Sequence, residues 1–174
     1  MGYELLSVNS VSLTVKNLVI NLLYWSITVF ALPWLILSLE KQLGVKAYLF
    51  TGSRFLAVLI GLAGVALQIR CVILFQRIGY GTPSPLFPTT TLVVSGPYSC
   101  VRNPMNLGEV MILLGLSSWF GSPGLLCYSI LAWISFHLFV IIYEEPNNSK
   151  RFGSEYDQYR NRVPRWIPRF RDGL

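Results

Sequence analysis

Long runs of apolar residues, separated by short polar stretches, dominate the pattern along the chain. Four of these runs approach or exceed the roughly 20 helical residues that cross a hydrocarbon core. They occupy residues 17–39, 55–75, 104–120 and 123–143. The third run is short, about 25 Å by helical rise. The pattern predicts an all-α, polytopic membrane protein with about four transmembrane helices, organised as a single membrane domain over residues 1–174.

The borders of the runs indicate how the helices connect. Only Gly121 and Ser122 separate the last two runs, and Pro123 opens the second of them, which predicts a tight antiparallel hairpin. The first run ends in the polar stretch "SLEK" and has no small-residue cleavage site, so we expect it to stay as an anchor and not to be removed as a signal peptide.

Two long polar segments lie outside the runs. The loop at residues 76–103 is rich in Gly, Pro and Thr and is too long for a mere connector, so we expect it to fold over something. In the tail at residues 144–174, apolar and aromatic side chains recur at helical spacing, namely at Phe152, Tyr156, Tyr159 and Val163. This spacing predicts an amphipathic helix on the membrane or under the loop, followed by an extended "PRWIP" segment suited to the interface.

Composition and charge support a multi-pass membrane protein. The chain is 53% hydrophobic and 13% charged, with a net charge of +6. Seven of its fourteen Lys and Arg residues lie after residue 149, directly behind an apolar run, so anionic membrane lipids are a simpler partner than nucleic acid. With four spans, ten basic residues lie on the same side of the membrane as both termini, and three lie on the opposite side. Arg70 falls inside the second run and belongs to neither count. We therefore expect both termini, the loop and the tail in the cytoplasm.

Several common kinds of site are not indicated. The cysteines Cys71, Cys100 and Cys127 are widely spaced and form no CxxC pair, and the chain has one histidine. We therefore expect neither a disulfide framework nor a metal site. The glycines of "GYGTPS" follow no predicted strand and open no predicted helix, so a Rossmann nucleotide site is not expected either.

A polar stretch, "GPYSCVRNPMNLGE" at residues 96–109, stands where the third run begins. Asn103 before Pro104 predicts a helix start whose free N–H groups, beside Arg102, attract a carboxylate or phosphate. The alternative is that Arg102 only anchors the helix to lipid phosphates. Glu109 lies two turns further along the same face and needs a partner in the bilayer, for which Arg70 is a candidate.

Glu144 and Glu145 stand at the end of the fourth run, followed by Pro146. Acidic residues at a helix C-terminus oppose the helix dipole, which favours a role in holding a cation over a plain solvated end. For His137, on the same face as Glu144, an interhelical hydrogen bond is the favoured interpretation. If the hairpin closes, the basic helix start and the acidic helix end meet, and a zwitterionic ligand would fit between them.

The order "GPYSCVRNPMNLGE", then "EE", then "RFGSEYDQYRNRVPRWIP" resembles the isoprenylcysteine carboxyl methyltransferase family and its phospholipid methyltransferase relatives, over roughly the C-terminal 100 residues. These are integral membrane enzymes that use S-adenosylmethionine without a Rossmann fold. The resemblance implies a cytoplasmic cofactor pocket between loop and hairpin, and a lipid-like or small hydrophobic acceptor that enters from the bilayer.

Carried over by motif, the resemblance implies a set of cofactor-binding residues in the loop, at the helix start and at the helix end. These are Thr91, Leu92, Val93, Tyr98, Asn103, Pro104, Met105, Asn106, Glu144 and Glu145. Arg102 and Glu144 are the expected catalytic residues, placed at opposite ends of the cofactor's amino acid part. Glu145 is expected to matter less, if its carboxylate faces solvent. The atom that is methylated stays open among O, N and S.

Three positions depart from the family pattern. Asn103 stands where many members have His, which excludes a histidine-based proton role there. Asn106 replaces a usual Tyr, which alters how the cofactor packs. Val140 stands where the prenylcysteine enzymes carry an Arg that binds the substrate carboxylate, one turn before the glutamates. A prenylcysteine carboxylate is therefore not the expected acceptor.

Two other classes of function remain open on the residues alone. A small four-helix transporter would use Glu109 as its intramembrane ion or proton site, with Arg70 as counter-charge. It explains the acid inside an apolar run but not the long loop, the "RNP" helix start or the order of the tail motifs. A scaffold that recruits partners through its basic tail is the third interpretation.

Overall fold

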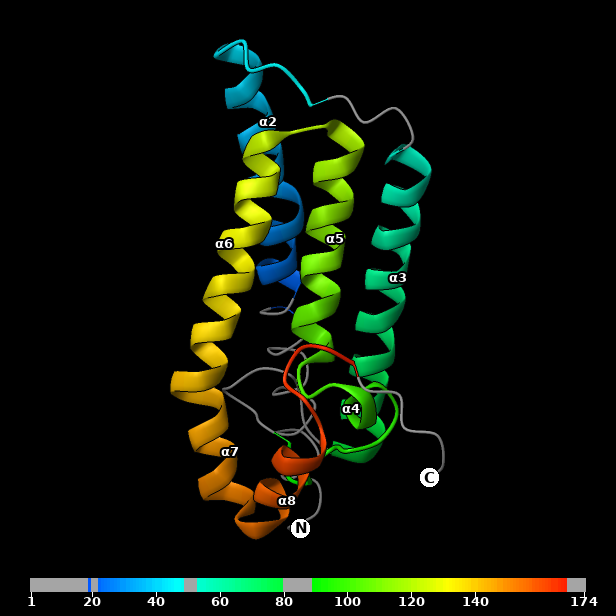
Figure 1. Ribbon diagram of the computed structural model, residues 1–174, viewed down its shortest axis with the longest axis vertical. Helices are drawn as coiled ribbons and strands as arrows, with labels where there is room; N and C mark the ends of the chain where they lie inside the picture. The colour runs from blue at the N-terminus through cyan, green and yellow to red at the C-terminus, as the bar shows by residue number, and fades with distance from the viewer. Residues whose placement is uncertain (1–18, 20–21, 49–52, 80–88, 169–174) are drawn as a thin grey trace, which may run out of the picture.

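The computed structural model describes residue 19 and residues 22–48, 53–79 and 89–168 (Figure 1). Within this part the chain is helical and contains no β-strand, which confirms the all-α prediction. The helical segments are, in chain order, η1 (Ser26–Ala31), α2 (Leu32–Gln42), α3 (Ser53–Leu74), η2 (Phe75–Gly79), α4 (Pro97–Cys100), α5 (Pro104–Phe120), α6 (Pro123–Phe139), η3 (Val140–Glu144), α7 (Glu145–Phe152) and α8 (Ser154–Arg162), where η marks a π-helical turn.

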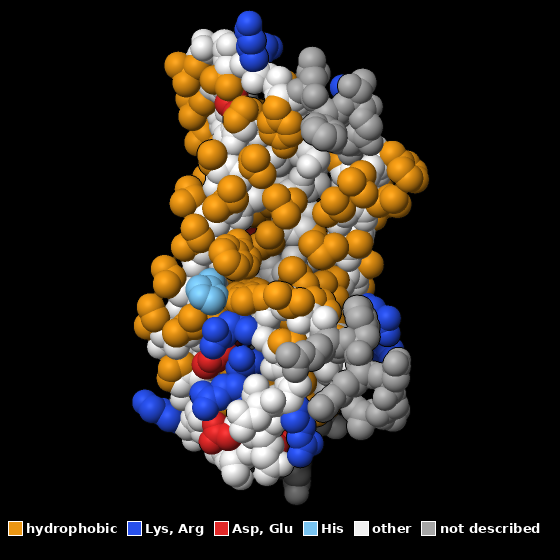
Figure 2. Space-filling view, viewed as in Figure 1, with side chains coloured by type: hydrophobic (Ala, Val, Ile, Leu, Met, Phe, Trp, Pro, Cys, Tyr) orange, Lys and Arg blue, Asp and Glu red, His pale blue; other side chains and the backbone are white. Residues whose placement is uncertain are grey.

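The four long helices run along the long axis of the molecule, with α5 between α3 and α6, and with α2 packed on α6 (Figure 1). The short helices α4, α7 and α8 gather at one end. Figure 2 shows hydrophobic side chains over the long helices and a cluster of Lys, Arg, Asp and Glu at the end with α7 and α8. An apolar belt above one charged end is the surface expected of a protein embedded in a bilayer.

Three helices are long and apolar enough to cross a membrane by length and composition, namely Leu22–Gln42, Arg54–Gly79 and Pro123–Phe152. The polytopic membrane prediction is thereby confirmed. The helix α5 has 17 residues, about 25 Å by helical rise. It is bounded by Pro104 and by Gly121, whose φ is 61°. A complete fourth crossing by α5 stays a prediction. Residues 17, 18, 20 and 21 of the first expected span lie outside the described residues, so the start of that span stays a prediction as well.

Small residues bring α3 and α5 into close contact. A Cβ atom added to Gly64 would lie 2.6 Å from the carbonyl oxygen of Gly108, and one added to Gly115 would lie 2.9 Å from that of Ala57. Where the two helices approach the charged end, the buried Gln68 donates a 3.0 Å hydrogen bond from Nε2 to the carbonyl of Met105. Close backbone approach of this kind is how apolar helices gain packing contacts in lipid. It fixes the start of α5 against α3.

The hairpin of α5 and α6 closes as predicted. The Ser122 hydroxyl accepts a hydrogen bond of 2.9 Å from the backbone N–H of Leu125 and so caps α6. It also donates to Glu40 Oε2 at 2.6 Å, while the N–H of Gly124 donates to Glu40 Oε1 at 2.6 Å. The carboxylate at the end of α2 therefore secures the turn at the end of the bundle opposite α7 and α8 (Figure 1).

The fourth expected span does not end at the two glutamates. The helix continues without a break from Pro123 to Phe152, through η3 and α7. Proline inside an α-helix removes one hydrogen bond and clashes with the carbonyl four residues earlier. Here the wider π turn η3 ends two residues before Pro146 and the helix continues past the proline, so the expected helix end is wrong.

The tail helix is divided in two. Gly153 has a φ of 56°, a value that favours glycine, and it separates α7 from α8. The predicted tail helix is therefore present as α8, but it is shorter than the apolar stripe, because Phe152 ends α7 and Val163 follows α8. Tyr156, Tyr159 and Val163 form a buried cluster with Phe152 and with Leu92 of the loop. The tail thus packs against the loop, which is one of the two predicted placements.

Glu109 is paired differently from the expectation. Its side chain is buried in α5, and its Oε1 accepts a 3.1 Å hydrogen bond from the hydroxyl of Tyr24 in the first helix. Arg70 is exposed on α3, and the described residues show no ion pair between it and Glu109. The suggested Arg70 partner is wrong; the first helix supplies the partner instead.

Candidate functional site

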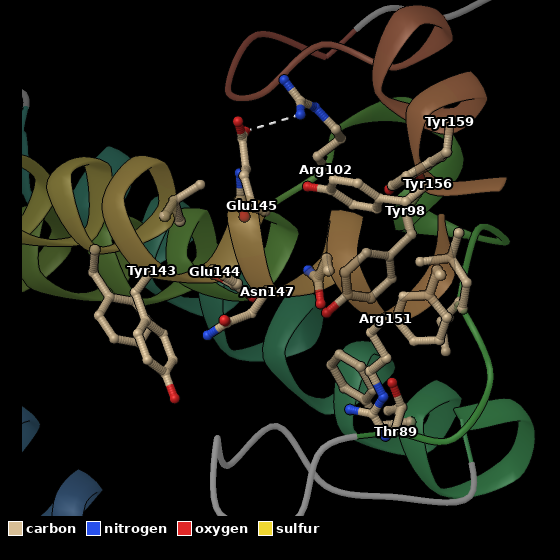
Figure 3. Close-up of a pocket in the computed structure, with 18 residues that line it drawn as sticks. Thr89, Tyr98, Arg102, Tyr143, Glu144, Glu145, Asn147, Arg151, Tyr156 and Tyr159 are labelled. Carbon is tan, nitrogen blue, oxygen red and sulfur yellow. Dashed lines mark hydrogen bonds and ion pairs between the residues drawn. The ribbon is translucent and has the colours of Figure 1, made fainter. Parts of the chain in front are cut away.

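A cavity of about 460 Å³ lies at the charged end of the bundle. Its wall comes from the loop before α4, the start of α5, the region of η3 and α7, and α8 (Figure 3). Pockets that hold drug-sized ligands and cofactors have about 300–1,000 Å³ and combine apolar walls with a few polar groups. The predicted residues in this lining are Leu92, Val93, Tyr98, Arg102, Asn103, Glu144 and Glu145.

Four predicted cofactor residues are not part of the lining. Thr91 is exposed, Pro104 is buried in the first turn of α5, and Asn106 is half-buried. Met105 packs against the buried cluster of Cys71, Val93 and Tyr98. Contact between these four residues and a cofactor stays a prediction.

Tyrosine rings form one side of the cavity, at the right in Figure 3, where Tyr98, Tyr156 and Tyr159 lie together. The hydroxyl of Tyr159 donates a 2.7 Å hydrogen bond to the backbone carbonyl of Tyr98. Burial raises the pKa of both Tyr159 and Tyr98 above the ordinary tyrosine value. The Tyr159 hydroxyl therefore stays protonated at neutral pH and remains a hydrogen-bond donor.

Glu145 is the centre of an ion cluster that we call the Glu145 triad, formed by Arg102, Glu145 and Arg165. Arg102 Nη1 lies 2.9 Å from Glu145 Oε1. Arg165 donates from Nε to Oε1 at 2.7 Å and from Nη2 to Oε2 at 2.9 Å. These bonds to Glu145 raise the pKa of Arg165 further. The start of α5 and the helix of α6 and α7 therefore meet at this end, as predicted, and a direct ion pair that was not predicted joins them.

The partner of Arg102 is, however, Glu145 and not Glu144. The side chain of Glu145 is 9% exposed and carries two arginine contacts, so the expectation that it faces solvent is wrong. Successive residues on a helix point about 100° apart, which means that only one of two adjacent glutamates can face Arg102. The π turn η3, whose last residue is Glu144, decides which one, because a π turn changes the phase of the helix.

Glu144 faces the cavity instead. It lines the wall and makes no hydrogen bond or ion pair with the other described residues. Arg102 also lines the cavity, and its Nε is buried without a hydrogen-bond partner in the described chain. Within the described residues the Glu144 carboxylate has no partner and the Arg102 Nε has no acceptor, and both residues line the same cavity. They fit the ammonium and the carboxylate of an amino acid, which is the end group of S-adenosylmethionine.

The irregular segment at residues 163–166, which we call the strap, closes the site from the side of the tail. The backbone N–H of Arg102 donates to the carbonyl of Pro164 at 2.9 Å, and Asn103 Nδ2 donates to the carbonyl of Arg165 at 3.2 Å. Trp166 Nε1 donates to His137 Nδ1 at 2.8 Å. The strap therefore binds both the start of α5 and the side of α6.

The strap corrects two expectations. The "PRWIP" segment is expected to be extended, but it contains bends and folds back onto the site. Its place at the membrane interface stays a prediction. Asn103 stands at the predicted start of α5, yet its side chain bonds the strap and does not cap the helix. The favoured hydrogen bond for His137 is present, with Trp166 of the strap as its partner instead of another membrane helix.

Several lining residues were not predicted from the sequence. Asn147, Asn148 and Arg151 extend the face of Glu144 along α7 at spacings of three, four and seven residues. That spacing is visible in the sequence, but only if the helix is known to continue past Pro146. Phe75 and Thr89 belong to the wall because η2 and the loop meet there, and no local signal marks them.

The site and fold define a membrane protein with a cofactor-sized cavity at one end of a helical bundle. A family model, that of the phospholipid methyltransferases, matches residues 53–155. The chain therefore belongs to the phospholipid methyltransferase family, and it is an integral membrane protein of a methyltransferase class. No curated protein is similar enough to match the chain.

The family gives no support to the transporter interpretation. The described residues contain no group of three or more His, Cys, Asp or Glu side chains that could hold a metal ion. The absence of a metal and of a nucleic acid partner stays a prediction.

Proposed function

We propose that the chain transfers a methyl group from S-adenosylmethionine to a lipid-like or small hydrophobic acceptor at the cytoplasmic side of the membrane. The observation that carries this proposal is the pairing of Glu144 and Arg102 in one cavity of a methyltransferase-family chain. Each of the two has a polar group that the described residues leave without a partner.

Charge and shape support the choice of cofactor. Glu144 would hold the ammonium of the cofactor's amino acid part, and Arg102 would hold its carboxylate. Tyr98, Tyr156 and Tyr159 offer flat aromatic surfaces at the other side of the cavity, suited to an adenine ring. When bound, S-adenosylmethionine supplies an electrophilic methyl group on a sulfonium.

The residues of this chain contribute to the reaction mainly by alignment and by excluding water. Methyl transfer is a direct displacement, which needs the attacking atom, the methyl carbon and the leaving sulfur in line. The strap and the tyrosine cluster close the cavity from the tail, and such closure protects a displacement from competing water. A thiolate or carboxylate acceptor would need no base.

An ammonium acceptor would first have to lose a proton. Glu145 is unsuited to accept it, because its two oxygens already bind Arg102 and Arg165. Glu144 lines the cavity and has no hydrogen-bond or ion-pair partner among the described residues, so one of its oxygens would hold the cofactor's ammonium and the other would accept the proton of an amine acceptor.

The nature of the acceptor follows from the position of the cavity. Phe139, Val140 and Tyr143 line it on the side where the apolar part of α6 begins, and Phe139 and Tyr143 are also exposed on the outer surface of the helix. An acceptor with an apolar body would lie against this surface, in the bilayer, with its reactive head in the cavity.

Calorimetric binding of S-adenosylhomocysteine to the purified protein in detergent tests the proposal. We expect saturable binding with one ligand per chain, weakened in Glu144→Gln. A second measurement follows the radiolabelled methyl group from S-adenosylmethionine into lipid extracted from the host membrane. A protein that is folded by thermal unfolding yet binds no S-adenosylhomocysteine would overturn the proposed function.

A further inference from the structure

We propose that Arg165 of the strap is a positioning residue that keeps Arg102 available to the anionic end of a ligand in the cavity. The inference rests on the proposed function, because the anionic end in question is the carboxylate of the cofactor. Arg165 does not line the cavity, and it would act through Glu145.

The contacts within the Glu145 triad are unequal. Arg165 binds both carboxylate oxygens of Glu145, through Nε at 2.7 Å and Nη2 at 2.9 Å, in the bidentate geometry that suits a guanidinium and a carboxylate. Arg102 makes a single bond to Glu145, from Nη1 to Oε1 at 2.9 Å. Arg165 therefore occupies the paired edge of the carboxylate, and Arg102 is left with a single bond to Glu145.

The single bond to Glu145 leaves the Nε donor of Arg102 unused. A guanidinium has five N–H donors, and the Nε of Arg102 is buried without a partner in the described chain. The side chain is 10% exposed, so bulk water reaches little of it. A buried donor without an acceptor is costly, and in a cavity wall it indicates that a ligand supplies the acceptor.

Arg165 is held in place by bonds that do not involve Glu145. Its own carbonyl accepts from Asn103 Nδ2 at 3.2 Å, and its neighbours are fixed by the bonds of Arg102 N–H to Pro164 and of Trp166 to His137. The strap lies beyond residues 53–155, which match the family model. The chain thus uses its tail to present a second arginine to Glu145.

Removal of the Arg165 side chain has a specific consequence. Glu145 would then have a free oxygen next to Arg102, and the two would close into a bidentate pair of their own. Arg102 would turn toward Glu145, and the ligand's carboxylate would lose its partner. The loss would affect ligands with that carboxylate and leave ligands without it unchanged.

The test compares two probes, S-adenosylhomocysteine and its analogue that lacks the α-carboxylate, by calorimetry on the full chain in detergent. We expect the parent protein to prefer S-adenosylhomocysteine about ten- to a hundredfold, the value of a charge-assisted hydrogen bond. In Arg165→Ala we expect the affinities for the two probes to differ by no more than about threefold. Arg165→Lys, which cannot bind both oxygens in the same way, should give an intermediate preference.

The double variant Arg165→Ala with Glu145→Gln separates positioning from a structural role. Without the charge on Glu145, Arg102 is no longer attracted to that side chain. The double variant should therefore prefer the probe with the carboxylate more strongly than Arg165→Ala alone does. A strap that serves only to hold the tail would not show this rescue. Arg162→Ala, which removes an exposed arginine of α8 outside the cavity lining, is the matched control and should keep the preference of the parent.

The outcomes are distinct from those of the proposed function. If the parent binds neither probe, the proposed function fails. If the parent binds both probes equally, or if Arg165→Ala keeps the full preference, the positioning role of Arg165 is wrong while the cofactor assignment stands. Should Arg165→Ala fail to fold in thermal unfolding, Arg165→Lys provides the comparison, and a preference equal to that of the parent would refute the inference.

Discussion

The hydroxyl of Tyr159 and the carbonyl of Tyr98 are joined by a 2.7 Å hydrogen bond across 61 residues of chain. Tyr98 stands just before the start of α5, and Tyr159 lies in α8, so the bond fastens the tail over the loop. Together with the strap, it makes the segment after the last membrane helix a wall of the cavity. Tail and membrane helices therefore depend on each other to form the site.

The first prediction follows from that bond. Tyr159→Phe removes the donor and leaves a buried carbonyl unsatisfied, which costs about 1–3 kcal/mol of the free energy of unfolding. We expect a lower thermal unfolding temperature and weaker S-adenosylhomocysteine binding. Tyr143→Phe is the control for stability, because the Tyr143 hydroxyl makes no hydrogen bond within the described chain. Equal stability of the two variants would show that the bond contributes nothing.

The bundle could be predicted from the sequence because a bilayer allows few solutions. In lipid, every backbone polar group must be satisfied within its own helix, so long apolar runs leave little choice. The hairpin could be predicted from two apolar runs, at 104–120 and 123–143, that are separated only by Gly121 and Ser122. The hairpin then brought the helix start near Arg102 to the level of the glutamates, which the Glu145 triad bears out.

The finer geometry of the site depends on features without a local signature. Whether Glu144 or Glu145 faces Arg102 is set by the π turn η3, which the residues of "VIIYE" do not mark. Pro146 ordinarily ends a helix, so the continuation through α7 and its polar face could not be foreseen. The fold-back of the strap depends on the pairing of Arg165 with a residue 20 positions earlier, and sequence spacing does not encode such a pair.

A second prediction concerns the contact of α3 with α5. Gly64→Ala places a Cβ 2.6 Å from the carbonyl oxygen of Gly108, and we expect overpacking to cost about 1–3 kcal/mol in the free energy of unfolding. Gly61→Ala, on the same helix, meets nothing within 4 Å and is the matched control. It should be neutral or slightly stabilising, since alanine favours a helix over glycine. Thermal unfolding in detergent distinguishes them, and an equal loss in both would disprove the close contact.

A third prediction is the orientation in the membrane. The end of the bundle opposite α7 and α8 carries Lys41, Lys46 and Arg54 (Figure 1). The arginines of the tail gather at the other end, with α7 and α8. By the positive-inside rule we expect the site and the C-terminus in the cytoplasm. Reporter fusions after residue 174 should give a cytoplasmic signal, and fusions after residue 46 should give the opposite one. A C-terminal reporter outside the cytoplasm would refute both the orientation and the cytoplasmic site.

A fourth prediction concerns the acceptor. Val140 lines the cavity one turn before Glu144, with 1% of its surface exposed, at the position where prenylcysteine enzymes place an Arg for the substrate carboxylate. Without that cation, binding of a prenylcysteine carboxylate loses a charge-assisted hydrogen bond. We expect poor or no methyl ester formation on farnesylcysteine analogues, but methylation of another hydrophobic acceptor in a lipid extract. Efficient turnover of a prenylcysteine would show that Val140 does not decide the substrate.

The last prediction separates the two adjacent glutamates by two different measurements. Glu144 has no partner among the described residues, so Glu144→Gln should leave thermal unfolding unchanged. It should weaken S-adenosylhomocysteine binding by about 1.5–3 kcal/mol, because a bond between charged groups becomes one to a neutral amide. Glu145→Gln should lower the free energy of unfolding by about 2–4 kcal/mol, because it leaves Arg102 and Arg165 without their shared carboxylate.

Glu155→Gln, at an exposed position of α8, is the control for the loss of one carboxylate and should change neither measurement. The contrast between Glu144 and Glu145 is what carries the test, because both variants remove one charge from adjacent residues of the same helix. If Glu144→Gln destabilises the protein as much as Glu145→Gln, Glu144 has a structural partner and is not reserved for a ligand. If Glu145→Gln unfolds at the temperature of the parent, the Glu145 triad does not hold the helix start to α7, and the site must be stabilised by the strap and the tyrosine cluster alone.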